Sequence, residues 1–98
     1  MIGSMGVAEN YPYILDMGKY GIHPCKSFKD AKRIVRIYIV APRIFAYPQN
    51  YDDPITNDGI ISQVLLQGNS VELYPSRFAK KRLLGRVYSS SNGYQIRV

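Results

Sequence analysis

The hydrophobic and polar positions show no regular period at the start of the chain. Residues 6–25 mix Tyr, Pro and Gly, which is typical of an extended arm or a long loop on the surface. We therefore predict an N-terminal arm over residues 1–25. Its apolar side chains need a host, and the core of their own chain is favoured because arms usually close on their own domain. The alternative is a contact with a second subunit through Tyr11, Tyr13, Ile14 and Leu15.

Two periods overlap in the segment KSFKDAKRIVRIYIVAP, residues 26–42. Apolar positions at helical spacing begin directly after Ser27, and Asp30 places an acid near the start of that helix. From residue 34 onward, however, the side chains are almost all β-branched or aromatic and alternate as in a strand. The pattern predicts a short helix over residues 28–33 and a strand over residues 34–41, with one helix through Val40 as the alternative.

Turn residues separate the elements that follow. Residues 47–59 are rich in Pro, Asn, Asp and Gly and are predicted to form a loop. The segments GIISQVLLQ and SVELYP flank Gly68 and Asn69, a pair that suits the type II′ turn of a hairpin. The segments RVYSS and YQIRV predict a second hairpin around the turn sequence SNG.

Between the two predicted hairpins lies the segment SRFAKKRLLGR. Ser76 suits the N-cap of a helix over residues 77–84, and Gly85 is placed to end this helix in the left-handed conformation. The expected apolar stripe of the helix consists of Phe78, Ala79 and Leu83. Its cations are then expected on the solvent side.

The sum of these elements predicts an α+β fold. We expect a single domain over residues 26–98, with a small, largely antiparallel sheet of four to five strands and one or two short helices on one face. The length of 98 residues and the hydrophobic fraction of 46% are sufficient for one modest core.

Charge adds a functional expectation to this architecture. The chain has 13 Lys and Arg against 7 Asp and Glu, a net charge of +6, which favours anionic partners. Residues 26–43 hold six of the cations against one acid, and residues 76–98 hold six against none. Solvated helix faces usually mix the two signs, so a basic segment without an acid is the anomaly that needs a partner.

Non-specific nucleic-acid binding through phosphates explains this anomaly, because each cation that neutralises a phosphate releases counterions. Unpaired bases can also stack on nearby tyrosines. The candidate binding residues are Arg77, Lys80, Lys81, Arg82, Arg86, Tyr88 and Tyr94. The alternative function is a homodimeric protein-interaction or structural module.

Other chemistries find little support. One His and one Cys, His23 and Cys25, are too few for a structural zinc site. A metal-dependent nuclease site built on Asp58 and Glu72 would need a Lys where Tyr74 stands. No nucleophile elbow, Walker loop or dinucleotide motif occurs. We therefore expect a protein that is not an enzyme and that uses no cofactor or metal.

The same composition bears on location. No apolar run approaches the length of a membrane span, and the start lacks the order of a signal peptide. A lone cysteine fits a reducing interior. These features favour a soluble protein of the cytoplasm that inserts into no membrane and that has no evident small-molecule substrate.

One resemblance rests on the residue composition of two segments, RIVRIYIVAPRIFAYP and YPYILDMGKYG. These segments are rich in Ile and Tyr, and the small chain has no Trp. In this composition the chain resembles the small orphan proteins of viruses that infect hyperthermophilic archaea. The resemblance implies a viral, DNA-associated or homo-oligomeric protein that acts inside the host cell.

Overall fold

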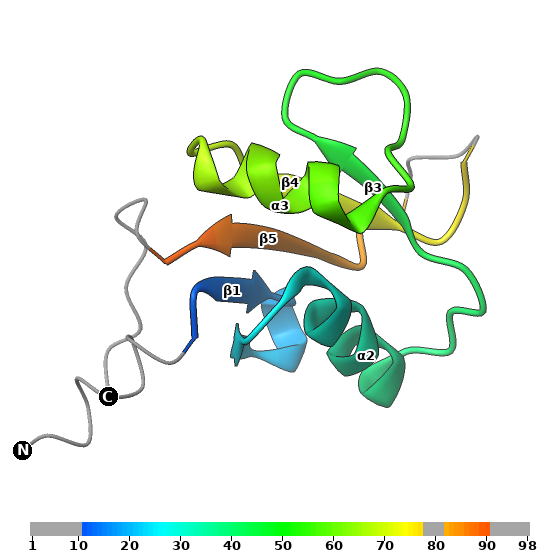
Figure 1. The fold of residues 1–98 in the computed structure, drawn as a ribbon. Helices are drawn as coiled ribbons and strands as arrows, with labels where there is room; N and C mark the ends of the chain where they lie inside the picture. Colours follow the sequence, from blue (N-terminus) through cyan, green and yellow to red (C-terminus); the bar gives the residue numbers. More distant parts are fainter. Residues whose placement is uncertain (1–10, 78–81, 91–98) are drawn as a thin grey trace, which may run out of the picture.

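The chain folds into one antiparallel sheet with two α-helices on one of its faces (Figure 1). The computed structural model describes residues 11–77 and 82–90. The strand order is β2-β1-β5-β4-β3. The strands are β1 (Tyr13–Asp16), β2 (Ile22–Cys25), β3 (Phe45–Pro48), β4 (Val71–Tyr74) and β5 (Gly85–Ser89), and the helices are α2 (Phe28–Tyr38), α3 (Asp58–Leu66) and the short 3-10 helix η1 (Gly18–Tyr20). The prediction of a small, largely antiparallel α+β fold is confirmed.

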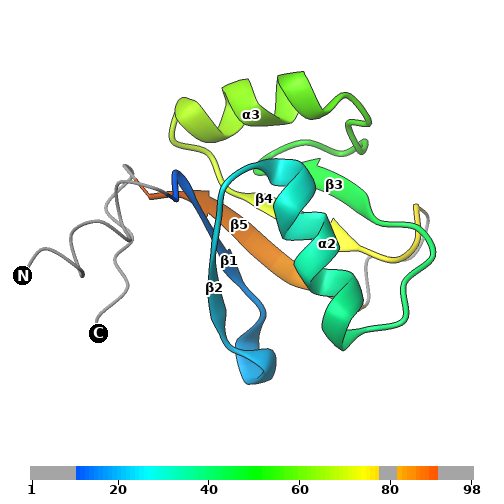
Figure 2. The same ribbon diagram turned by 60° about the horizontal axis from the view of Figure 1, so that its bottom comes forward.

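The core lies between the sheet and the helix layer, and Figure 2 shows both helices against the same sheet face. Each helix buries side chains spaced three and four residues apart, the period that keeps them on one side of a helix. Strand residues of the same sheet face complete the core by alternation. Among its fully buried members are Phe28, Val35, Ile61, Leu65, Leu15, Val71, Leu73 and Val87.

Helix α2 corrects the predicted change from helix to strand after Arg33. The start of the helix agrees with the prediction, since the Ser27 hydroxyl accepts a hydrogen bond from the Asp30 amide at 3.0 Å. The helix then continues to Tyr38, close to the alternative that ended at Val40. Burial of Ile34 and Val35 beside Ala31 outweighs the strand preference of the β-branched residues, because tertiary packing overrides propensity.

Helix α3 replaces the first strand of the predicted hairpin around Gly68. Its N-cap is Asn57, whose side chain accepts hydrogen bonds from two backbone amides. At the other end, Gly68 has a φ of 98°, and the amides of Gly68 and Asn69 donate to Leu65 and Val64. This is the Schellman arrangement of a helix C-terminus. The glycine that suggested a hairpin turn therefore ends a helix, and only the second predicted strand forms, as β4.

Residues 11–25 contain the strands β1 and β2 of the sheet, so the predicted arm is wrong for this part of the chain. Strand β1 pairs with both β2 and β5. Side chains of β1 lie in the domain's own core, with Tyr13 and Leu15 in the main cluster. The host favoured by the sequence, the same chain, is the one observed. Residues 1–10 lie outside the described part of the chain.

The connection from β4 to β5 also differs from its prediction. Residues 78–81, including Phe78 and Ala79, lie outside the described residues, but a helix reaching residue 84 is wrong. The Leu84 amide instead donates to the Leu73 carbonyl at 2.8 Å and extends the strand pairing. Leu83, expected in the core, is exposed, and Leu84 is buried.

Gly85 likewise begins β5 rather than ending a helix, and it is not among the glycines of positive φ. The segment RVYSS is a strand, as predicted, since β5 covers Gly85–Ser89. Its predicted hairpin partner, YQIRV, falls within residues 91–98, which are outside the described part of the chain. The loop predicted over residues 47–59 starts later than expected, because β3 includes Tyr47 and Pro48.

Candidate nucleic-acid interface

Four cations of α2 lie on one side of the helix. At about 100° per residue, Lys32, Arg36, Lys29 and Arg33 follow one another around an arc of about 100° beside the buried stripe. The stripe itself is formed by Phe28, Ala31, Ile34 and Val35. Arg43, in the connection to β3, adds a fifth exposed or half-exposed cation. We call these five residues, Lys29, Lys32, Arg33, Arg36 and Arg43, the α2 basic face.

Two of these five charges are partly neutralised. Lys32 Nζ lies 3.0 Å from Asp58 Oδ1 at the start of α3, and Arg33 lies 2.7 Å from Asp30 Oδ1. The hydrogen bond from Arg33, followed by one from the Lys26 amide, lowers the pKa of Asp30. Asp30 therefore stays ionised and stabilises the start of the helix, where a negative charge is favourable.

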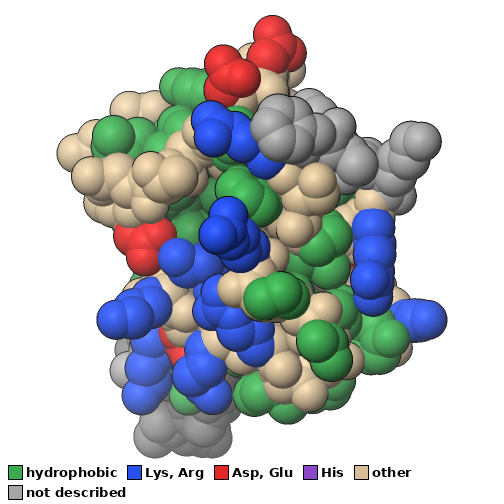
Figure 3. Space-filling model, turned by 90° about the vertical axis from the view of Figure 1, so that its right-hand side faces the viewer, with side chains coloured by type: hydrophobic (Ala, Val, Ile, Leu, Met, Phe, Trp, Pro, Cys, Tyr) green, Lys and Arg blue, Asp and Glu red, His purple; other side chains and the backbone are tan. Residues whose placement is uncertain are grey.

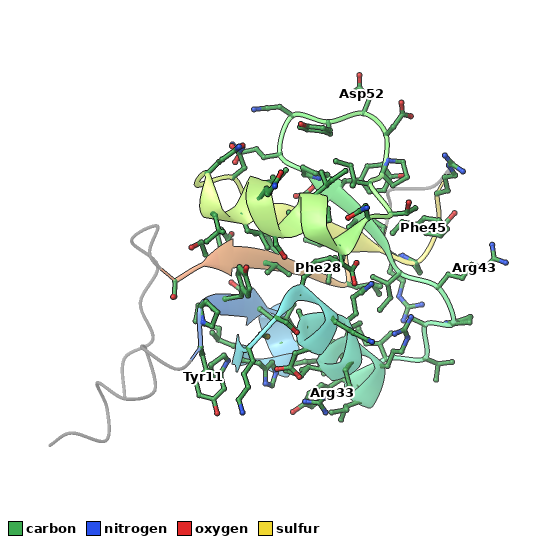
Figure 4. The ribbon with its side chains drawn as sticks, in the orientation of Figure 1. Tyr11, Phe28, Arg33, Arg43, Phe45 and Asp52 are labelled. Atoms are coloured by element: carbon green, nitrogen blue, oxygen red, sulfur yellow. The ribbon has the colours of Figure 1, made fainter. Side chains whose placement is uncertain are left out.

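The other three cations take part in none of the ion pairs of the described residues. Arg36 donates its Nε to the Ala41 carbonyl at 3.3 Å, which holds the guanidinium over the connection between α2 and β3. Within residues 11–77 and 82–90, the ion pairs formed do not involve Lys29, Arg36 or Arg43. Figure 4 shows Arg43 extending outward at this end of the domain. Guanidinium groups with free donors suit phosphate oxygens, which they bind in pairs.

A shallow groove of about 280 Å³ adjoins the α2 basic face. It lies between α2, the start of β3 and the N-terminus of α3. Its apolar lining includes Phe28, Ile44, Ala46 and Ile55, and its polar lining includes Lys32, Arg36, Arg43, Thr56 and Asp58. The groove thus combines an apolar floor with a rim on which cations outnumber the acid.

The charge on this end of the molecule is strongly one-sided. Figure 3 shows the end where α2 leads toward β3, with Lys and Arg side chains gathered across the middle and lower left and acidic side chains toward the margins. Figure 4 places Asp52 at the tip of the loop between β3 and α3, away from Arg33 and Arg43. An anion that approaches this end meets more cations than acids.

A second, larger hollow of about 490 Å³ lies beside the loop that follows β3. Its described lining consists of Pro48, Gln49, Asn50, Tyr51, Asp52, Ser70 and Glu72, which includes two acids and no cation. An anionic ligand is unfavourable there, so size alone does not make it the better candidate.

The residues predicted from the sequence as a nucleic-acid site fall into three groups. Arg77 and Arg82 are exposed and flank the connection from β4 to β5, which Figures 1 and 2 place at the same end of the molecule as the connection from α2 to β3. Lys80, Lys81 and Tyr94 lie outside the described residues.

Arg86 and Tyr88 form the third group, on the sheet face opposite the helices. Arg86 is paired with Glu72 on the neighbouring strand. Hydrogen bonds to Glu72 and then Tyr88 raise the pKa of Arg86. Glu72 also accepts from the Tyr74 hydroxyl at 3.0 Å. Arg86 therefore takes part in a cross-strand network that partly neutralises its charge, and its assignment as a phosphate contact stays a prediction.

The predicted oligomer contact is also corrected. Tyr13, Ile14 and Leu15 are buried in their own domain, with Leu15 fully inaccessible. Tyr11 is half-buried, and the Lys26 ammonium lies 5.9 Å from the centre of its ring. Three of the four side chains are therefore not available to a second subunit.

The Cys25 thiol and the His23 ring, the remaining candidates for chemistry, both contact neighbours in their own domain. Cys25 is fully buried, and burial, followed by the charge of Asp30, raises its pKa to about 12. The His23 ring lies 2.8 Å from the Tyr20 carbonyl and packs against Tyr38. The described residues contain no group of three His, Cys, Asp or Glu side chains that could hold a metal. Within them, no helix has the length and apolar character needed to cross a bilayer.

The sequence carries the cations of the α2 basic face, but the predicted change from helix to strand after Arg33 separates them. The sequence shows an excess of cations over residues 26–43, but a strand over residues 34–41 places Arg36 apart from Lys29 and Lys32. A helical projection continued to Tyr38 brings these three cations to one side.

Comparison with protein-family models, curated proteins and solved structures finds no match.

Proposed function

We propose that this protein binds nucleic acid without sequence specificity, through phosphate contacts of the α2 basic face. The observation that carries the proposal is the gathering of cations from α2 and from the connection to β3 on one side of the fold, where Lys29, Arg36 and Arg43 are not used in the ion pairs of the described residues. Arg77 and Arg82, which are also exposed, are further candidates for phosphate contacts.

The physical basis is counterion release. A cation that replaces condensed counterions on a phosphate gives an affinity that falls with salt, with a slope of about −0.9 per contact on duplex DNA and about −0.7 on a single strand. Such binding needs exposed, unpaired cations and no catalytic group. The chain's expected lack of enzymatic activity stays a prediction, as does a viral origin.

The test is fluorescence anisotropy with labelled oligonucleotides between about 50 mM and 200 mM salt. Two double variants have equal net charge and remove cations at different places, arginines in one variant and lysines in the other. Arg36→Gln with Arg43→Gln removes two charges from the α2 basic face. Lys19→Gln with Lys26→Gln removes two exposed charges from the region of η1 and β2. We expect the first variant to weaken binding and to lower the magnitude of the salt slope by about 1.4 to 1.8.

The control variant is expected to bind almost as the wild type does. Equal losses in the two variants would show that net charge alone governs the interaction. Absence of binding by the wild type at low salt would end the proposal. Preference for vesicles of anionic phospholipid over every oligonucleotide would also contradict it.

A second function, homodimerisation, is favoured by a separate observation. Near the end of α2, Val40 is 94% exposed and Ile37 is 63% exposed, and Tyr38 and Ile22 are about half exposed. Exposed apolar side chains in one region are typical of interaction surfaces. Sedimentation velocity tests this directly: a dimer that dissociates on Ile37→Glu with Val40→Glu supports this alternative, and a monomer at all concentrations excludes it.

A further inference from the structure

We infer that the groove beside the α2 basic face receives the base of an unpaired nucleotide, so that the protein prefers single strands to duplexes. This inference rests on the proposed function and specifies its substrate class. It starts from the composition of the groove, where apolar side chains form the floor and cations stand on the rim.

The apolar floor of the groove would make no contact with the bases of a duplex. Phosphates on a duplex face outward and contact cations on a protein surface, while the bases are stacked inside. Ile44 and Ile55 are half-buried and pack against the core. They are therefore apolar groups held at a fixed position between Arg36 and the N-terminus of α3. A flat, apolar base face is complementary to such a floor.

The extent of the positive area also favours one strand. Asp58 lines the groove beside Lys32 and is 41% exposed at its side chain. This carboxylate interrupts the cationic surface on the α3 side, where the second phosphate row of a duplex would need a further positive track. One strand needs a single row of cations, and Arg36 and Arg43 supply such a row along the rim.

Exposed aliphatic side chains also lie close in sequence to the cations of the rim. Val40 and Ile37 are among the most exposed apolar side chains of the described residues, and both lie within four residues of Arg36 or Arg43. Cations next to exposed apolar groups suit a ligand that presents phosphate and base together, as an unpaired strand does.

The experiment compares three ligands of equal length with the wild-type protein, and the two single-stranded ligands also have equal phosphate numbers. These are a single strand of thymidines, the same strand with every base removed, and a duplex. Pure electrostatics favours the duplex, because its charge density and its salt slope are higher. A base in the groove reverses this order. We expect the thymidine strand to bind about tenfold more tightly than the abasic strand, which corresponds to one base contact, and more tightly than the duplex.

The outcomes separate this inference from the proposed function. If no ligand binds, the proposed function fails. If the duplex binds as tightly as the thymidine strand or more tightly, or if the abasic strand equals the thymidine strand, nucleic-acid binding stands and the inference is overturned. The variant Ile44→Asn, with its fold checked by circular dichroism, is expected to reduce the difference between thymidine and abasic strands while leaving the salt slope unchanged. Should this variant not fold, the three-ligand comparison decides alone.

Discussion

Asp30, at the start of α2, connects the helix to the residues that follow β2. Asp30 accepts hydrogen bonds from Arg33 and from the Lys26 amide, while its own amide donates to the Ser27 hydroxyl. This reciprocal arrangement satisfies donors that the first turn of a helix leaves free. It fixes the point at which β2 leads into the helix that carries the basic face. The residue types at this cap could be read from the sequence, because caps depend on local contacts only.

Asp30 gives the first prediction, on pH dependence. The folded pKa of Asp30 is below its ordinary value, so its ionised form stabilises the fold above the unfolded pKa, and that stabilisation is lost as the pH falls through the folded value. We expect Asp30→Asn to lower the free energy of unfolding at neutral pH by about 1 kcal/mol or less. Urea denaturation should show this difference shrinking in acid. The control Asp53→Asn, at an exposed loop position, should change little at any pH. A difference for Asp30→Asn that is constant with pH would contradict the assignment.

Cys25 gives the second prediction at this scale. A rise of the thiol pKa from 9.0 to about 12 leaves a thiolate fraction roughly a thousandfold smaller at the same pH, and the side chain is fully buried. We expect a thiol-specific disulfide reagent at mildly alkaline pH to react with the unfolded protein at once and with the folded protein at least several hundredfold more slowly. Rapid labelling of the folded protein would show that β2 opens or that the thiol is accessible.

At the scale of elements, the sequence predicted the fold class but misassigned several segments. The local signal at Ser27 marked a helix start correctly, whereas Asn57, the N-cap of α3, lies in a segment predicted to be a loop. The extent of α2 and the identity of α3 depend on which apolar residues reach the core, and β-branched runs fit a helix or a strand equally in such short stretches. The position of β1 beside β5 depends on pairing between distant segments. Nothing in the local pattern of residues 11–25 encodes that pairing.

Gly85 gives a prediction that separates the two interpretations of its role. In the structure it lies in β5, where an added Cβ would meet Leu15 Cδ1 at 3.0 Å and the Asp16 carbonyl oxygen at 3.2 Å. The backbone oxygen has little freedom to move, so Gly85→Ala should destabilise the fold by about 1–3 kcal/mol. Gly85→Asn should be worse, because its side chain is larger. A left-handed helix end would give the reverse order, since Asn tolerates that conformation. Thermal denaturation of both variants decides.

The edge strands limit how this sheet can assemble with another chain. β2 carries Pro24 and β3 carries Pro48, and proline has no backbone N–H to donate to an added strand. The outer side of β3 is further engaged by Ile55, whose amide donates to the Ala46 carbonyl at 2.9 Å. Pairing of two copies edge to edge is therefore disfavoured. A homodimer, if formed, would use side-chain surfaces such as that near Val40.

At the scale of the whole molecule, the fold concentrates charge that the sequence distributes in two segments. Five of the six cations of residues 26–43 belong to the α2 basic face, and Arg77 and Arg82 are exposed on either side of residues 78–81. From the sequence, the basic character and the nature of the partner could be proposed. Which of the described cations are already paired could not be predicted, because it depends on the fold: Arg86 with Glu72, Lys32 with Asp58 and Arg33 with Asp30.

The most direct test of the central claim is a titration of the isotope-labelled protein with a single-stranded oligonucleotide, followed by amide chemical shifts. We predict that the largest shifts fall in the second half of α2, in residues 40–46 and in residues 55–58, the elements around the groove. Amides of β2 and η1 should remain near their starting positions. Largest shifts in β2 and η1, or shifts spread evenly over the surface, would contradict the assignment of the α2 basic face as the binding site.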